Sequence, residues 1–157
     1  MNSKRRIFLK GTLASSAVAV AVGAGLLNPR QVLAAAWPKS AFESKDVANG
    51  LKGLYNEDLT TPSTDIEIKA PEIAENGAVV PIIVNTSIKG VSSISLFIEK
   101  NPSPLAANFN LASNCLGTVA TRVKMGKTSN VIAIVKSGGK LYSTGKEVKV
   151  TIGGCGG

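Results

Sequence analysis

Histidine is absent from this chain of 157 residues, and cysteine occurs only twice, as Cys115 and Cys155. Without histidine, the Ser-His and Cys-His nucleophilic systems and all histidine metal sites are excluded. Two cysteines this far apart in the sequence also do not match the ligand spacing of a zinc site or an iron–sulfur cluster. We therefore expect neither a metal site nor a resident cofactor.

Acidic and aromatic residues are also scarce, at ten Asp and Glu and 4% aromatic residues. The acidic pairs Glu57-Asp58 and Asp65/Glu67 fall at a helix exit and on alternating strand positions, where charges are normally solvated. We expect no catalytic residue. Five of the 18 basic residues and none of the acidic ones lie in residues 1–36, so the remainder has a net charge of only +3. A surface of this kind lacks the dense basic footprint of a nucleic-acid-binding protein.

Residues 1–36 have the features of a twin-arginine signal peptide. The basic segment Lys4-Arg5-Arg6-Ile7-Phe8-Leu9-Lys10 precedes an Ala/Gly/Val-rich run at residues 11–27, and Ala34-Ala35-Ala36 forms a small-residue cleavage site. The alternative is a membrane anchor, but this run is short and weakly apolar for a membrane span. We predict export to the periplasm by the twin-arginine route, with cleavage near Ala36.

The start of the mature chain contains one amphipathic pattern. Apolar residues at Val47, Leu51, Leu54 and Tyr55 have helical spacing, which predicts a helix over residues 41–55. We expect Ser44 to be the N-cap, with Asp46 in the first turn. The helix either covers the protein's own sheet, which we favour, or docks a partner.

From residue 61 onward the hydrophobic period changes to two, which predicts strands. A two-glycine hairpin is predicted at Ser137-Gly138-Gly139-Lys140. With turn signals between short strands, we predict an all-β fold, an immunoglobulin-like antiparallel β-sandwich with one N-terminal amphipathic helix, over residues 37–152. The expected strands are residues 65–69, 79–84, 94–98, 107–111, 118–125, 131–135, 141–142 and 146–152.

The chain closes with a cysteine surrounded by glycines. Gly153 and Gly154 precede Cys155, and Gly156 and Gly157 follow it. Glycine populates both signs of φ, and a tail without apolar side chains gains little from burial. We predict a flexible arm over residues 153–157 that begins after Ile152 and presents the Cys155 thiol to solvent.

The last ten residues, VKVTIGGCGG, together with the export signal and the β-rich body, resemble the SoxY family of periplasmic sulfur carriers. The resemblance implies the same sandwich fold and a carrier that is not itself an enzyme, with thiosulfate-derived sulfur held covalently on Cys155. It also implies a SoxZ-like subunit as heterodimer partner. The SoxAX c-type cytochrome, the SoxB hydrolase and, in many systems, SoxCD would act on the carrier.

Cys115 departs from this family pattern, in which the arm thiol is usually the only one. We favour a small, buried or half-buried apolar side chain near a strand start. The alternative is a regulatory disulfide, formed with Cys155 in the same chain or between subunits. Two other functions therefore stay open: a thiol-disulfide redox protein that uses Cys115 and Cys155, and a binding sandwich whose terminal thiol is incidental.

Overall fold

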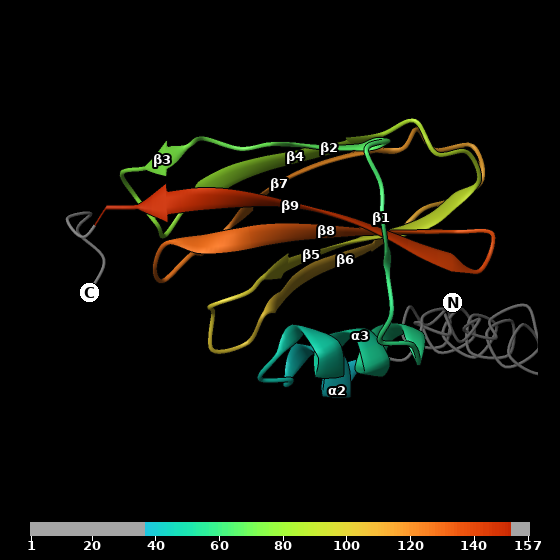
Figure 1. The fold of residues 1–157 in the computed structure, drawn as a ribbon, viewed down its shortest axis with the longest axis horizontal. Helices are drawn as coiled ribbons and strands as arrows, with labels where there is room; N and C mark the ends of the chain where they lie inside the picture. Colours follow the sequence, from blue (N-terminus) through green and yellow to red (C-terminus); the bar gives the residue numbers. More distant parts are fainter. Residues whose placement is uncertain (1–36, 152–157) are drawn as a thin grey trace, which may run out of the picture. The chain divides into compact units, whose positions relative to one another are not determined.

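The computed structural model describes residues 37–151, and residues 1–36 and 152–157 lie outside the described part. The predicted signal peptide and the predicted arm, with Cys155, fall in the outside segments. Within residues 37–151 the chain forms helices at its start and strands afterwards (Figure 1). The helices are α2 (Lys39–Phe42) and α3 (Val47–Tyr55). The strands are β1 (Thr61–Pro62), β2 (Ile66–Lys69), β3 (Ile73–Ala74), β4 (Val80–Thr86), β5 (Val91–Ile98), β6 (Leu105–Asn110), β7 (Thr118–Val123), β8 (Ser129–Ser137) and β9 (Lys140–Val150).

The strands form two sheets. One has the order β9-β8-β5-β6, with β1 and β3 added at the outer edge of β9, and the other has the order β2-β4-β7. From β4 onward the chain passes between the sheets after β4, after β6 and after β7, which is the Greek-key connectivity of immunoglobulin-like domains. The predicted all-β sandwich with a helical N-terminal segment is confirmed.

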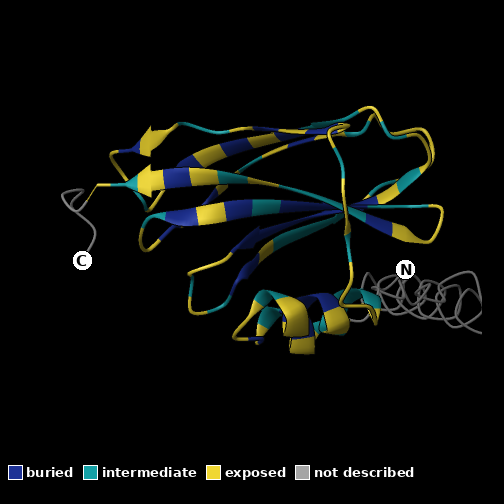
Figure 2. Ribbon diagram, viewed as in Figure 1, coloured by how far each residue is buried: buried dark blue, intermediate teal, exposed yellow. Residues whose placement is uncertain are grey.

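Alternating side chains of both sheets meet in a common core. On β5 the residues Ile94, Leu96 and Ile98 point inward, and Val131 and Val135 of β8 lie opposite them, all fully buried. Figure 2 shows this alternation of buried and exposed residues along β4. The period-two pattern therefore places the core between the sheets, as predicted from the sequence.

A second apolar cluster lies on the outer face of the β5–β8 sheet, beneath the helices. Phe97, Ile134 and Leu141 pack there against Ala41 and Leu51. The approach is close, because a Cβ on Gly50 would lie 2.7 Å from Cε1 of Phe97. The favoured interpretation of the amphipathic helix, that it covers the protein's own sheet, is confirmed.

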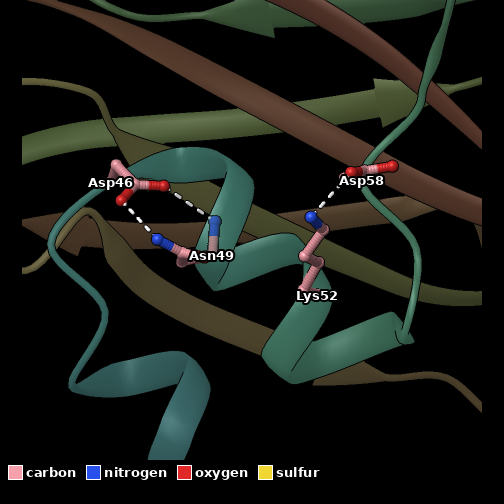
Figure 3. A network of polar contacts seen from close by, with 4 residues as sticks. All are labelled: Asp46, Asn49, Lys52 and Asp58. Atoms are coloured by element: carbon pink, nitrogen blue, oxygen red, sulfur yellow. Dashed lines mark hydrogen bonds and ion pairs between the residues drawn. The ribbon is translucent and has the colours of Figure 1, made fainter.

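The prediction of one helix over residues 41–55 was wrong in detail, because the chain is interrupted between α2 and α3. The N-cap of α3 is Asp46, whose extended backbone and Oδ1 atom, 2.8 Å from the amide nitrogen of Asn49, satisfy the first turn (Figure 3). Ser44 instead is buried, and its hydroxyl donates to the carbonyl oxygen of Ala41 at 2.7 Å. Lys52 of α3 forms a 2.9 Å ion pair with Asp58, which follows the helix (Figure 3).

The predicted hairpin is confirmed, and it joins β8 to β9 through Gly138 and Gly139, both with positive φ. The two strands expected after it are one continuous strand, because β9 pairs with β8 from Lys140 to Val148. Two short parallel partners of β9, β1 and β3, were not predicted. Neither described helix is long and apolar enough to cross a bilayer.

Candidate functional site

The final strand positions the start of the predicted arm. β9 ends at Val150, and Thr151 is the last described residue. On one side, the amide of Val150 donates to Oγ1 of Thr128 at 3.0 Å. On the other, the amides of Lys149 and Thr151 donate to the carbonyl oxygens of Glu72 and Ala74, at 2.9 Å and 3.2 Å. The end of β9 is thus hydrogen-bonded along both edges.

A tight turn before β4 packs against this end of β9. The carbonyl oxygen of Gly77 accepts from the amide of Met125 at 2.7 Å. A Cβ on Gly77 would lie 2.4 Å from the carbonyl oxygen of Met125 and 2.8 Å from Cγ1 of Val150, so only glycine fits without movement. No pattern in the sequence showed that this turn packs against the end of β9.

The predicted attachment residue Cys155 and its neighbours Gly153, Gly154, Gly156 and Gly157 lie outside the described residues. The chain length alone sets their range. Cys155 is four residues beyond Thr151, so it can lie at most about 14 Å from that anchor, at about 3.5 Å per extended residue. Ile152, where the arm was predicted to begin, lies outside the described part as well.

Cys115 is exposed and free, so the prediction that it is a buried or half-buried apolar side chain was wrong. It lies in the turn before β7, where its amide donates to the carbonyl oxygen of Ala112 at 2.9 Å. The loop has no inward-pointing position for it, since the strand and its alternation start only at Thr118. Cys115 lines a hollow of about 430 Å³, which Leu111, Leu116 and residues 88–92 also form.

Cys115 and the end of β9 lie at opposite ends of the sandwich. The hollow with Cys115 includes Val91, which pairs with Ser137 at the hairpin where β9 begins. From there β9 runs the length of its sheet to Val150 (Figure 1), about 30 Å at ~3.3 Å per residue. Five residues after Val150 reach at most about 18 Å. The structure therefore does not bring Cys115 within reach of Cys155 in the same chain.

A buried polar network under α3 was missed by the sequence analysis. The hydroxyl of Tyr55 lies 3.1 Å from Oγ of Ser93 and also hydrogen-bonds Oγ of Ser95, which in turn donates to Asn108 at 2.9 Å. Burial raises the pKa of Tyr55, and the two serine hydrogen bonds oppose that rise. The sequence did contain a signal for this network: two serines of β5 alternate with its core residues and lie on the face that the helix covers. The network fastens the helix to the sheet.

Residues 37–151 contain no group of three Cys, Asp or Glu side chains arranged to hold a metal ion. The exposed acidic side chains behave as the sequence suggested: Asp58 pairs with Lys52, and Glu67 lies 3.6 Å from Lys69. The hydrogen bond and ion pair from Lys52 lower the pKa of Asp58. Among the described residues, the feature nearest to the predicted attachment residue in the chain is the anchored end of β9.

The described residues form an immunoglobulin-like sandwich, and its last strand leads toward Cys155. The profile of the family described as "Sulfur oxidation protein SoxY" matches residues 51–155, and this chain belongs to that family. The sulfur carrier protein SoxY from Chlorobium limicola f thiosulfatophilum is a similar solved structure, with 45% identity and a TM-score of 0.61. The match covers 66% of this chain and 94% of that one.

A more distant similarity is to the superoxide reductase (neelaredoxin) from Ignicoccus hospitalis. It has 19% identity and a TM-score of 0.49, over 55% of this chain and 80% of that chain. No curated protein sequence matches this chain.

Proposed function

We propose that this protein is a periplasmic covalent sulfur carrier of thiosulfate oxidation, with Cys155 as the attachment residue. The observation that carries the proposal is the anchored end of β9, a few residues before a cysteine at which the family match ends. The 45% identity to a sulfur carrier protein supports it. The hydrogen bonds at the end of β9 support an anchored start for the proposed arm, and the glycines around Cys155 let a thiol without a bulky neighbour enter a narrow active site.

The proposed loading step joins the sulfane sulfur of thiosulfate to the sulfur of Cys155. The thiol loses its proton, the new S–S bond forms, and two electrons pass to the SoxAX cytochrome. SoxB then hydrolyses the adduct with one water, which releases sulfate and leaves a persulfide on Cys155. SoxCD, where present, oxidises that remaining sulfur. The protein itself is the substrate of these enzymes and needs no cofactor of its own.

The carrier works as a heterodimer with a SoxZ-like subunit in this proposal. The twin-arginine signal in residues 1–36 exports folded proteins, so a subunit without its own signal can cross the membrane bound to this one. Docking of the carrier on each enzyme raises the effective concentration of the arm at that active site.

The test is mass spectrometry of the C-terminal peptide after incubation with thiosulfate and SoxAX. We expect the peptide that contains Cys155 to gain the mass of S2O3, because the thiol hydrogen is replaced by an S2O3H group. Cys155→Ser removes the label and Cys115→Ala keeps it. A labelled Cys155→Ser protein contradicts the proposal.

The redox alternative requires Cys115 and Cys155 to form a disulfide. About 18 Å of chain after Val150 cannot bridge the roughly 30 Å between that residue and the hollow with Cys115. A disulfide between these residues within one chain therefore requires several residues of β9 to detach from β8. Non-reducing peptide mapping of the oxidised monomer decides the point, and we expect no peptide that links residues 115 and 155. A Cys115→Ala variant with full carrier activity argues against the redox function as well.

A further inference from the structure

One side of the sandwich has no charged residue over a long stretch of chain. Between Lys100 and Arg122, residues 101–121 contain no Asp, Glu, Lys or Arg. The stretch includes all of β6, the loop with Cys115, and β7 up to Thr121. Its solvent-exposed residues are Pro102, Ala106, Asn110, Ala112, Ser113, Asn114, Cys115, Leu116, Thr118 and Ala120.

β6 and β7 are the outer strands of the two sheets, and they lie on the same side of the molecule. At the other side, β2 packs against β9, so the opposite ends of the two strand orders must also lie together. Within residues 37–151, β6 pairs only with β5, and β7 only with β4. We call this region, residues 105–121, the β6–β7 side.

The two sides of the sandwich differ in how their edges are protected. The edge of β9 is covered by β1 and β3, and β2 has the charged residues Glu67 and Lys69. Charges, prolines and covering strands are the usual means of keeping an edge from pairing with another chain. On the β6–β7 side, Pro104 precedes β6, α2 contacts this strand and a register irregularity lies near Leu105, but Ala107–Asn110 are regularly paired on their inner side.

The core is also incompletely covered on this side. Phe109 and Leu111 pack against the main core, yet both stay half-buried, whereas the core residues of β4 and β5 are fully buried. At the end of the β6–β7 side lies the hollow of about 430 Å³, and Leu116, which lines it, is 83% exposed. Depletion of charge around exposed apolar side chains is the composition found at the centre of protein interfaces.

The charges near this side are mostly basic; the acidic exception is Asp65, whose carboxylate accepts a 3.4 Å hydrogen bond from Ser87, next to Ile88 of the hollow. Lys89 lines the hollow, and Lys100 and Arg122 lie at the ends of the uncharged stretch. The carboxylate of Glu99 accepts a 2.9 Å hydrogen bond from Asn130 of β8, on the other side of β5. A second copy of this chain would bring like charges together, so the surroundings favour a different polypeptide with acidic residues around its contact surface.

We propose that the β6–β7 side binds the partner subunit, which adds an uncharged extended strand to a free sheet edge and places an apolar side chain in the hollow beside Leu116. The inference rests on the proposed function, since that function requires a heterodimer. Backbone hydrogen bonds at the edge supply affinity, and the hollow and the basic surroundings select the partner.

Affinity for the purified SoxZ-like subunit, measured by titration calorimetry with the full mature chain, tests this assignment. We expect Leu116→Lys to weaken binding at least about tenfold, because it places an unpaired charge in the interface. Leu59→Lys is the matched control: Leu59 is 82% exposed but precedes β1 on the other side, and we expect less than about a twofold change. Ala106→Lys on β6 is the second test variant, with Ile83→Lys on the outer face of β4 as its control.

Unchanged affinity of both Leu116→Lys and Ala106→Lys overturns the assignment, and so does a wild-type chain that binds no partner. If the wild-type chain alone is a dimer that Leu116→Lys dissociates, the surface binds a second copy and the assignment to a different polypeptide is wrong. Labelling of Cys155 is measured separately. Loss of labelling with normal partner binding contradicts the carrier function and leaves the interface supported.

Discussion

The amide of Val150 donates a 3.0 Å hydrogen bond to Oγ1 of Thr128, which joins the end of β9 to the loop before β8. This bond continues the ladder between β8 and β9 beyond its last pair, Ser129 and Val148. Thr128 therefore takes the place of a strand partner at the point where the described strand ends.

Thr128→Val is expected to release the end of β9. The variant keeps the side-chain shape but leaves the Val150 amide without this acceptor, which costs about 1 kcal/mol of unfolding free energy. Hydrogen exchange at Val150 and Thr151 should become faster, with little change at the centre of β9. Thr118→Val, at an exposed position of β7, is the control. Unchanged exchange at Val150 in the Thr128→Val variant would show that the bond does not hold the strand end.

Gly77→Ala is expected to destabilise the protein by about 1–3 kcal/mol, because the added methyl group overpacks a site fixed by backbone atoms. Urea unfolding measures the difference. The matched control is Gly126→Ala, where the nearest atom to an added Cβ is Oδ1 of Asn101 at 3.9 Å. Equal stability of the two variants would contradict the close packing of the turn on Val150.

Tyr55→Phe is expected to lower the unfolding free energy by about 1–2 kcal/mol, because Ser93 and Ser95 lose their shared partner under α3. The network also predicts that the unfolding free energy depends on pH. Burial raises the folded-state pKa of Tyr55 above its ordinary value of 10.0, so the unfolded chain loses this proton first. The stabilisation of the folded state that this pKa difference provides is complete below pH 10.0. It is lost as the pH rises from there through the folded-state pKa.

Denaturant unfolding between neutral pH and alkaline pH measures this effect. The wild-type protein should lose more stability than Tyr55→Phe over the alkaline part of the range. Parallel curves for the two proteins would contradict the assignment of that loss to Tyr55.

Asp46→Ala is expected to lower the melting temperature, because α3 loses its N-cap. Hydrogen bonds from the backbone and then the side chain of Asn49 lower the pKa of Asp46 below its ordinary value of 3.8. The stabilisation of the folded state by the ionised Asp46 carboxylate is present above pH 3.8. It is lost as the pH falls through the folded-state pKa. Asp46→Asn keeps a capping oxygen without this titration. Thermal melts from pH 7 to pH 3 should therefore separate the three proteins, and identical acid profiles for the wild-type and Asp46→Asn proteins would contradict this assignment.

The features that the sequence predicted are those with a local or periodic signal. Ile94, Leu96 and Ile98 mark a strand face by alternation, and Gly138-Gly139 mark a hairpin by their conformational freedom. The sequence analysis chose Ser44 as the N-cap, but the N-cap is Asp46. Both residue types cap helices, and only the backbone shows where the interruption between α2 and α3 lies.

Contacts between distant segments had no such signal. β1 and β3 are two residues long. They pair with β9, a strand that most of the domain's sequence separates from them. The exposure of Cys115 likewise follows from the loop that connects β6 to β7, which no periodic pattern describes. The resemblance in the last ten residues identified the family, but the interface proposed on the β6–β7 side required the strand order of both sheets.

The continuous strand β9 also has a mechanical consequence. A pull on its C-terminal end acts along the strand, while its hydrogen bonds to β8 and to β3 run across it. These bonds are therefore loaded together in shear and do not open one after another. A force applied along the strand at Val150 is therefore resisted by all of these bonds at once.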